Sequence, residues 1–431
     1  MSNKPKCILT VDVEAFPMRA PDKYIDTLIY GRIGGEEWGI GRIMDIANQC
    51  GVKITFFLDF AEAEYYGDKI TDVGRYIVAR GHELQIHCHG DCFEKAVRER
   101  FPDADKWYPA WYEDSQISEF IVNYCLEQYY KCTDKTPIVF RGGAYRFGTE
   151  LLKKLKEKGI AADASYNCLI PKPLPMTKQF TYENGLLELP VSVLPGKGSL
   201  QTLNFNSGSL YPVCKEDRER ILGRYQKIFD GFYRYYGKDA VACLMMHSWS
   251  FCYDEERYQS AGYFDRPNIY AAELFEQFLK VFCDKIDFIT ASEALQPGTE
   301  FFSNKFEFSE VFSLCAMMEK ENLRNLVHFI QKEADEREIV VWGKGWVESE
   351  IVETLDIFTM LKVKFYISRD ARYNRSWRNR PVFTYEEVEL SPQKHYVFVC
   401  AQPIFPEIRE ALRNAGFLEN RDYYDILKPA Q

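Results

Sequence analysis

Short strand-like segments alternate with helix-like segments between residues 7 and 290 of the chain. The expected strands span residues 7–14, 52–58, 84–89, 137–141, 160–165, 186–194, 241–247 and 286–290. The expected helices span residues 36–50, 70–80, 115–131, 148–158, 215–236 and 270–283. Several of these helices end at a glycine, the residue that most often follows a helix. Because strands such as residues 7–14 are apolar on both faces, the alternation predicts a parallel α/β barrel with helices outside.

Ionisable side chains gather at the carboxyl ends of these strands. They are Asp12 and Glu14, His87 and His89, Asp91 in the turn beyond, Arg141, Asp163 and His247. Side chains at positions i and i+2 of a strand share a face, so each of the first two pairs projects together. The carboxyl ends of parallel strands meet at one edge, which is where barrel active sites form.

The stretch from His87 to Asp91 carries two imidazoles and a carboxylate within five positions. Those are ligands that suit a divalent transition metal, and zinc above all. The alternative is a buried strand whose histidines hydrogen-bond to the backbone. Similarly, Arg141 could reach solvent, or it could lie beside Asp12 and orient that carboxylate.

Composition excludes some functions and favours a cytoplasmic protein. The formal net charge is −10, with no basic stripe of the kind that a general nucleic-acid-binding protein needs. Thirteen cysteines occur without a CxxC pair, mostly singly in apolar surroundings, which favours free buried thiols in a reducing compartment. No segment resembles a signal peptide or approaches the length of a membrane span.

Residues 91–114 interrupt the strand–helix alternation and predict a long loop rich in aromatic side chains. Loops of this length inside a compact domain are usually functional or disordered. The aromatic rings could form a wall for a sugar substrate, or they could pack over the mouth of the barrel.

A second α/β unit is expected after the barrel. We predict a barrel at residues 1–296, a helical connector at 297–336, and a small Rossmann-like domain at 337–431. Gly343 begins a glycine turn between a strand and a helix, but Glu348 replaces the third glycine of a dinucleotide motif. An acid in the first helical turn repels a pyrophosphate, so a docking or stabilising role is favoured over nucleotide binding.

Residues 7–295 resemble the catalytic domain of polysaccharide deacetylases (NodB-type, carbohydrate esterase family 4), a distorted (β/α) barrel. The resemblance rests on five motifs in order: Thr10-Val11-Asp12-Val13-Glu14, Gly81-His82-Glu83 through His87, Phe140-Arg141-Gly142-Gly143, Asp163-Ala164-Ser165, and Leu244-Met245-Met246-His247. The C-terminal part more weakly resembles accessory Rossmann-type domains of bacterial surface-sugar biosynthesis proteins.

The resemblance implies a metal site built on Glu14 and His87. The family's second metal histidine lies four residues after the first, where this chain has Asp91. His89 is therefore the expected substitute, with Asp91 as a possible additional ligand. The implied cofactor is a divalent metal, and zinc is the expected ion.

The resemblance also implies catalytic roles. Asp12 corresponds to the catalytic base and Arg141 to the residue that orients it. Asp163 corresponds to a residue that supports the final histidine, and His247 corresponds to the general acid.

These observations predict a metal-dependent deacetylase acting on an N-acetylated sugar. A nucleotide- or lipid-linked intermediate of surface polysaccharide biosynthesis fits a chain without an export signal better than a finished wall polymer. Two alternatives stay open at this stage. One is hydrolysis of another C–N bond, in a formamide or a cyclic ureide, and the other is a non-catalytic carbohydrate-binding or assembly protein.

Overall fold

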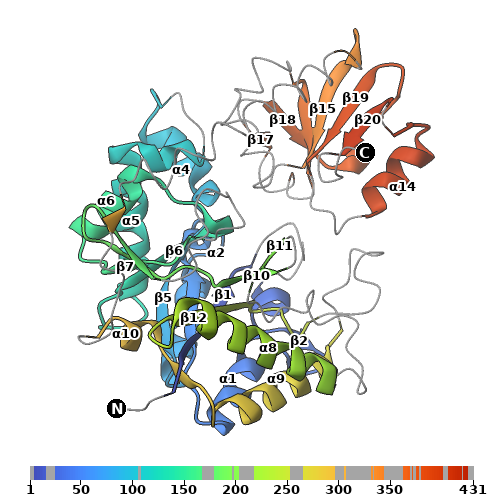
Figure 1. The fold of residues 1–431 in the computed structure, drawn as a ribbon. Helices are drawn as coiled ribbons and strands as arrows, with labels where there is room; N and C mark the ends of the chain where they lie inside the picture. The colour runs from blue at the N-terminus through green and yellow to red at the C-terminus, as the bar shows by residue number, and fades with distance from the viewer. Residues whose placement is uncertain are drawn as a thin grey trace. The chain divides into compact units, whose positions relative to one another are not determined.

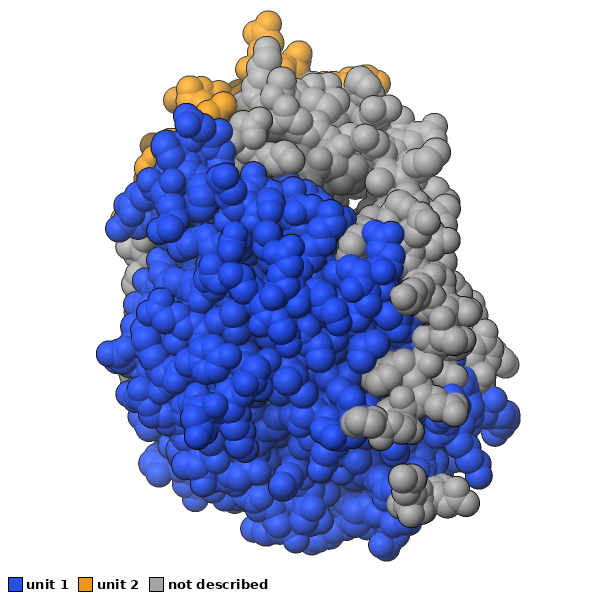
Figure 2. All heavy atoms as spheres, turned by 90° about the vertical axis from the view of Figure 1, so that its left-hand side faces the viewer, with its two compact units in different colours: residues 1–15, 25–255, 264–313 blue, residues 16–24, 256–263, 314–431 orange. Residues whose placement is uncertain are grey.

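The computed structural model divides into two compact units (Figures 1 and 2). Unit 1 comprises residues 1–15, 25–255 and 264–313, and unit 2 comprises residues 16–24, 256–263 and 314–431. The structure describes residues 4–15, 25–104, 108–166, 179–196, 199–202, 218–252, 266–296, 305–306, 332, 334–343, 363–368, 371, 375–377, 380–400, 406–419 and 421–425. The expected helical connector at 297–336 falls mostly outside these ranges, so the three predicted domain boundaries stay predictions.

Unit 1 is built on a ten-stranded sheet whose order is β12-β1-β4-β5-β6-β7-β9-β8-β14, with β13 also paired to β1. The strands are β1 (Lys6–Val13), β4 (Thr55–Asp59), β5 (Glu83–Cys88), β6 (Val139–Gly142), β7 (Ala162–Asp163), β8 (Phe180–Tyr182), β9 (Leu187–Glu188), β12 (Val241–His247), β13 (Asp287–Ile289) and β14 (Lys305–Phe306). Every pairing from β12 through to β9 is parallel, and β8 runs antiparallel to β9.

The sheet curls until its two ends approach each other. Beyond β9, the backbone N–H of Ser192 donates to the carbonyl of Cys243 in β12, and the N–H of Cys243 donates to the Ser192 hydroxyl. These two bonds, rather than a regular ladder, join the segment after β9 to β12. The predicted distorted (β/α) barrel is therefore confirmed.

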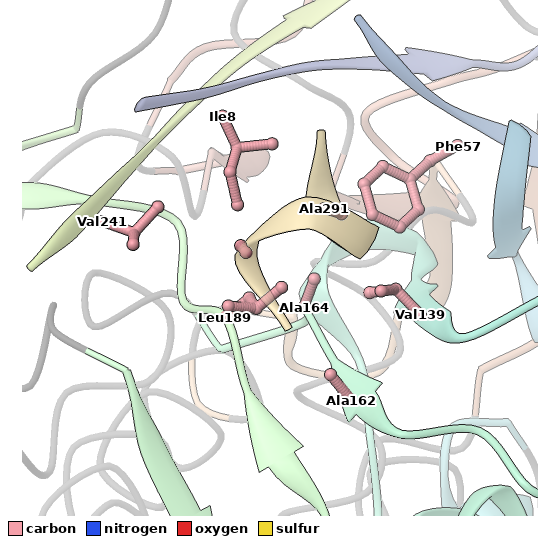
Figure 3. Close-up of a cluster of buried hydrophobic side chains, with 9 residues drawn as sticks. Ile8, Phe57, Val139, Ala162, Ala164, Leu189, Val241 and Ala291 are labelled. Atoms are coloured by element: carbon pink, nitrogen blue, oxygen red, sulfur yellow. The ribbon is translucent and has the colours of Figure 1, made fainter. Parts of the chain in front are cut away.

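The interior of the barrel is a compact apolar cluster around a short helix, α10 (Ala291–Ala294) (Figure 3). Side chains from β1, β4, β6, β7 and β12 converge on Ala291. The Glu83 carboxylate, at the start of β5, accepts hydrogen bonds from the backbone N–H groups of Ala291 and Ser292. An acid at a helix N-terminus satisfies backbone donors that would otherwise lack partners, so Glu83 fixes this helix inside the barrel.

Helices cover the outside of the sheet (Figure 1). They are α1 (Ile40–Gln49), α3 (Asp68–Ala79), α5 (Ser115–Tyr130), α6 (Thr149–Glu157), α8 (Arg218–Tyr236) and α9 (Ile269–Phe282). α8 packs on α9 through an edge-to-face contact of Tyr225 with Phe278, whose ring centroids are 5.1 Å apart. The Asp114 side chain caps α5 by accepting from the backbone N–H groups of its first turn.

The predicted helix at 36–50 begins too early. Residues Glu36–Glu37 form a short strand, β3, that pairs with β2 (Arg32–Ile33). A β-carbon at Gly39 would lie 2.0 Å from the Ile29 carbonyl oxygen, so the backbone passes too closely there for any other residue. The helix starts only after this close approach.

The predicted loop at 91–114 is also partly wrong, because it contains helix α4 (Glu94–Arg100). Its aromatic rings at Phe93, Tyr108, Trp111 and Tyr112 are buried. They therefore pack inside unit 1 and do not wall a sugar groove, while Trp107 lies outside the described residues.

The predicted strand at 186–194 is divided in two. β9 ends at Glu188, and β10 (Val193–Gly196) pairs with β11 (Ser199–Thr202) as a separate hairpin. Pro190 lies between the two strands and has no N–H to donate to a ladder, which explains the interruption.

Unit 2 contains a six-stranded sheet in the order β17-β18-β16-β15-β19-β20. The strands are β15 (Glu338–Trp342), β16 (Phe365–Ile367), β17 (Ser376–Trp377), β18 (Arg380–Phe383), β19 (His395–Val399) and β20 (Tyr423–Asp425), and helix α14 (Pro406–Asn414) follows β19. All pairings except that of the edge strand β17 are parallel, and the order of β18 to β20 is that of a doubly wound sheet. Gly343, just after β15, has a φ of 107°, but the rest of its motif lies outside the described residues. The Rossmann-like assignment stays a prediction.

The described cysteines are all free thiols, as predicted. In the part of the chain that the structure describes, no helix has both the length and the apolar character needed to cross a bilayer.

Candidate functional site

Strand register brings the ionisable strand ends together in unit 1. Asp12 of β1 lies opposite His247 of β12, and His87 of β5 lies opposite Arg141 of β6. Glu14 follows directly after β1. Because these strands are parallel, their carboxyl ends meet at one edge of the curled sheet, as the sequence predicted.

The Glu14 carboxylate is surrounded by three imidazole rings. His89 Nε2 lies 2.6 Å from Glu14 Oε2, and His87 Nε2 lies 3.9 Å from the same oxygen. His247 Nε2 lies 3.3 Å from Glu14 Oε1. Glu14, His87 and His89 are all buried, so their polar atoms depend on one another rather than on solvent.

Glu14, His87 and His89 form a group suited to a divalent metal. Each offers one ligand atom, and these atoms all lie within 4.8 Å of one another. His87 Nδ1 is buried and makes no hydrogen bond to any residue that the structure describes. Two imidazoles and one carboxylate form a three-ligand set of the kind seen in catalytic zinc sites, which leaves a position for water or substrate. The residues therefore fit the expected ion.

Asp91 lies on the other side of the His89 ring and is not a member of this group. Its Oδ1 atom is 3.8 Å from His89 Nδ1, whereas His89 Nε2 faces Glu14. A carboxylate behind a metal-binding histidine typically orients the ring and raises its basicity. The geometry therefore favours His89, rather than Asp91, as the metal ligand that follows His87 along the chain.

The two histidines carry different charges. Burial lowers the pKa of His87 to about 4, so its imidazole is neutral at pH 7. Burial acts in the same direction on His89, but the Glu14 carboxylate outweighs it and raises the pKa of His89 to about 10. Burial alone would raise the pKa of Glu14, yet His89 and His247 hold it well below its usual range. The buried Glu14 carboxylate and His89 imidazole therefore form an ion pair, with the neutral His87 imidazole beside them.

Arg141 reaches across the barrel to Asp12. Its Nη1 donates to Asp12 Oδ1 at 2.6 Å and to the Thr10 hydroxyl at 2.9 Å, and its Nε donates to the Ala164 carbonyl at 3.1 Å. The guanidinium is fully buried and lies over the Phe57 ring, 4.1 Å from its centroid. A buried arginine held by this many partners fixes the orientation of the Asp12 carboxylate.

His247 lies at the carboxyl end of β12 and is more exposed than the other imidazoles, with 20% of its side chain accessible. Its ring stacks on Trp249, with centroids 4.5 Å apart. Its backbone N–H donates to the Ser250 hydroxyl. The stacking holds the imidazole at the rim, where it can meet both Glu14 and a substrate.

Asp163 is one strand beyond Arg141 and takes part in a buried acid pair. It accepts hydrogen bonds from the hydroxyl and the N–H of Ser165. Its pKa is raised to about 6, chiefly by burial. Burial, together with the Asp163 charge, raises the pKa of Glu188 well above its usual value. Support of His247 by Asp163 stays a prediction.

The acid pair should make unit 1 less stable as pH rises. Both carboxyls bind protons more tightly in the folded state than in the unfolded state. Their contribution to the free energy of unfolding is therefore greatest below about pH 4, and the Asp163 part is lost as the pH rises through about 6. For Asp163 alone the loss is on the order of 2–3 kcal/mol. Glu188→Gln, which cannot ionise, should remove the Glu188 part of the difference between thermal unfolding at pH 5 and pH 8 and leave the part that burial of Asp163 causes.

Glu119→Gln on the exposed face of α5 is the control and should leave the pH profile unchanged. If the wild type and Glu188→Gln lose the same amount of stability between pH 5 and pH 8, ionisation of Glu188 does not contribute to that loss.

No family model matches the sequence, and no curated protein matches it either. Several solved structures, however, are similar to the chain. A protein from Mycobacterium smegmatis, described provisionally as a polysaccharide deacetylase, is 18% identical, with a TM-score of 0.44 over 68% of this chain and 89% of its own. The chain is similar in fold to polysaccharide deacetylases of carbohydrate esterase family 4.

Two further structures are members of that esterase family. The one from Streptomyces lividans, solved with acetate, is 8% identical, with a TM-score of 0.33 over 66% of this chain and 91% of its own. A pseudoenzyme from Bacillus anthracis is 12% identical, with a TM-score of 0.34 over 69% of this chain and 67% of its own. All three TM-scores are below 0.5, so function is argued from the site of this chain.

The structure adds two buried acids that the sequence analysis missed. Asp59, at the end of β4, accepts a hydrogen bond from the His89 N–H at 3.2 Å. Both oxygens of Glu62 accept from the N–H of Ala15, next to Glu14, at 2.7 and 2.9 Å. The two acids thus hold the backbones that carry two metal-site residues. Asp59 shares the strand-end position of Asp12, which could have identified it, whereas nothing in the sequence marked Glu62.

The glycine pair after Arg141 packs directly against His89. A β-carbon at Gly143 would lie 2.2 Å from Cγ of the His89 ring, and one at Gly142 would lie 1.7 Å from the Arg146 carbonyl oxygen. The sequence placed these glycines beside the arginine without indicating their contact. They are required because the turn has no room for a side chain.

Gly143→Ala is therefore expected to push the His89 ring from its position and weaken metal binding by about 10–100-fold, the range for a disturbed supporting contact. Titration of the metal-free protein with zinc measures the effect. Gly223→Ala is the matched control, because a β-carbon there meets nothing within 4 Å in helix α8. Unchanged zinc affinity in Gly143→Ala would mean that His89 does not bind the ion.

Proposed function

We propose that the chain is a metal-dependent hydrolase that removes an N-acetyl group from a sugar. The proposal rests above all on one observation: the Glu14, His87 and His89 ligand atoms cluster beside a buried Asp12–Arg141 ion pair and the rim imidazole of His247. A metal site, an oriented carboxylate and an imidazole are the components of metal-assisted amide hydrolysis.

Glu14, His87 and His89 would hold the ion, and zinc suits this combination of one carboxylate and two imidazoles. When bound, the ion polarises the acetyl carbonyl and lowers the pKa of a water molecule. Asp91 would orient the His89 ring from behind.

Asp12 would act as the base that takes the proton from the attacking water. Arg141 holds that carboxylate in one orientation through the 2.6 Å bond to Oδ1. His247, as its imidazolium, would give a proton to the departing nitrogen. An amide needs this step because an amide anion is too poor a leaving group.

We further propose that the substrate is a nucleotide- or lipid-linked sugar intermediate of surface polysaccharide biosynthesis. Free thiols at the described cysteines are typical of proteins that work in a reducing compartment. The rings of Phe93, Tyr108, Trp111 and Tyr112 are buried, so they are not available to stack on the sugars of a long polymer.

Acetate release from soluble nucleotide-linked and lipid-linked N-acetyl sugars, compared with chitin oligomers and peptidoglycan, tests the proposal. We expect turnover of the linked single sugars by zinc-loaded protein and none after chelation. Preference for the polymers would contradict the substrate class. Formate or ureide products would identify hydrolysis of another C–N bond, and absence of both metal and turnover would identify a non-catalytic carbohydrate-binding protein.

A further inference from the structure

Asp163 and Glu188 form a buried carboxyl pair on the side of the sheet that faces away from the barrel interior. Ala162 and Ala164 both belong to the interior apolar cluster (Figure 3), so Asp163 between them projects to the opposite side of the strand. Glu188 lies opposite Asp163 in the neighbouring strand β9. Any influence of this pair on the metal site therefore passes through the groups that the pair contacts.

The pair carries one negative charge at neutral pH. Burial, together with the Asp163 charge, raises the pKa of Glu188 well above its usual value, so Glu188 is the protonated partner. Its oxygens accept from the Tyr166 N–H and the Tyr182 hydroxyl, each at 3.0 Å. The pKa of Asp163 is about 6, so Asp163 is the ionised partner at pH 7.

Ser165 connects the Asp163 carboxylate to strand β6. Its hydroxyl donates to Asp163 Oδ1 at 2.7 Å, and its N–H donates to Asp163 Oδ2 at 3.2 Å. A serine hydroxyl has one hydrogen, and here that hydrogen is held by the carboxylate through a charge-assisted bond. The hydroxyl oxygen is thereby directed as an acceptor, and it accepts the Gly142 N–H at 2.7 Å.

Gly142 begins the turn against which His89 packs. A β-carbon at Gly143 would lie 2.2 Å from Cγ of the His89 ring, so the turn and the ring are in direct contact. The Ala164 carbonyl, next to Ser165, accepts from Arg141 Nε at 3.1 Å. Residues 164–165 thus hold both the last side chain of the strand and the first N–H of the turn.

The turn is strained, so its path depends on such external bonds. Ala144 has a φ of 50° and Tyr145 a φ of 60°, and neither is a glycine. Residues of this kind keep a left-handed conformation only where surrounding structure enforces it. Loss of the bond between Ser165 and Gly142 would let the turn relax and would move the surface on which the His89 ring rests.

We propose that Ser165 is a positioning residue for the metal site, through which the carboxyl pair outside the barrel fixes the turn that supports His89. This inference rests on the proposed function in one respect, that His89 binds a metal ion, and it does not depend on the substrate. Ser165 is outside the ligand group and acts on it through the backbone of Gly142.

Ser165→Ala removes the acceptor of the Gly142 N–H and tests the proposal. We expect the zinc affinity of the metal-free protein to fall about 10–100-fold, the range for groups that orient a metal ligand. Ser192→Ala is the matched control, because the buried Ser192 hydroxyl accepts the Cys243 N–H at the same distance of 2.7 Å, where the barrel closes. Both variants should be destabilised to urea, and only Ser165→Ala should lose zinc affinity. Unchanged zinc affinity in Ser165→Ala would overturn the proposal.

A double variant shows whether the effect passes through the turn. Gly143→Ala disturbs the same contact with His89, so Ser165→Ala combined with it should bind zinc about as weakly as the weaker single variant. Ser192→Ala combined with Gly143→Ala should match Gly143→Ala alone. If the losses caused by Ser165→Ala and Gly143→Ala multiply in the double variant, the route through the turn is wrong.

Ser165→Thr and Ser165→Val form a second test that stays valid if Ser165→Ala does not fold. Their side chains have nearly the same shape and differ in the hydroxyl, so the threonine variant should bind zinc about tenfold more tightly than the valine variant. Equal affinities would overturn the positioning role.

Acetate release separates this inference from the proposed function. Zinc binding that depends on Ser165, without acetate release from any sugar, would overturn the deacetylase function and support the positioning role. Acetate release by a protein whose zinc affinity is independent of Ser165 would overturn the positioning role alone. A wild-type protein that binds no zinc would overturn both.

Discussion

His87→Ala is expected to abolish stoichiometric metal binding and reduce turnover to background. The His87 imidazole is buried, and burial lowers its pKa to about 4, so it is a neutral ligand at pH 7 that need not release a proton. The only other nitrogen in the ligand group belongs to His89, which is paired with Glu14. Elemental analysis of protein purified without chelator should fall from about one equivalent of metal to near zero.

Asp91→Ala is the informative companion to that variant. Because Asp91 faces the back of the His89 ring, its removal should weaken the metal by about 10–100-fold and still leave a detectable site. His395→Gln in unit 2 controls for adventitious binding to histidine and should keep full occupancy. If Asp91→Ala loses the metal as completely as His87→Ala, Asp91 is a ligand and His89 is not.

Asp12→Asn is expected to lower kcat/KM by about 10²–10⁴-fold, the usual contribution of a positioned general base. An asparagine keeps the shape of the side chain, and its Oδ1 can still accept the Arg141 hydrogen bond. The amide cannot take a proton from water, so chemistry is lost while the metal stays bound. Steady-state kinetics and metal analysis on the same sample separate the two effects.

Asp72→Asn provides a matched control, since it neutralises the aspartate of an exposed pair with Arg75. Exposed ion pairs contribute little, so activity and stability should stay close to wild type. Full activity in Asp12→Asn would assign the base to another residue, and Asp59 would be the next candidate because it lies beside His89.

Strand ends were predictable from the sequence because the patterns there are local. β12 was predicted at 241–247 and is observed with those bounds, and α5 differs from its prediction by one residue at its end. Predictions failed where a long-range contact decided the local path. The close approach at Gly39 delays α1, and α4, within the predicted loop 91–114, buries Val97.

The candidate site divides in the same way. A strand period of two and a parallel sheet are enough to place Asp12, Glu14, His87 and His89 at one edge. Neither the strand period nor the parallel direction determines the distance between strands that are not neighbours in the sheet. The reach of Arg141 across Phe57 to Asp12 depends on how strongly the sheet curls.

The sequence by itself determined the barrel, its order of strands and helices, and the residue types at its carboxyl edge, because hydrophobic periodicity and strand direction are properties of short segments. Only the tertiary structure decided that His89 faces Glu14 while Asp91 stays behind it. It alone placed Asp59 and Glu62 on the backbones of the site. Those relations depend on sheet curvature and on turns without room for a β-carbon, which arise only when distant segments pack together.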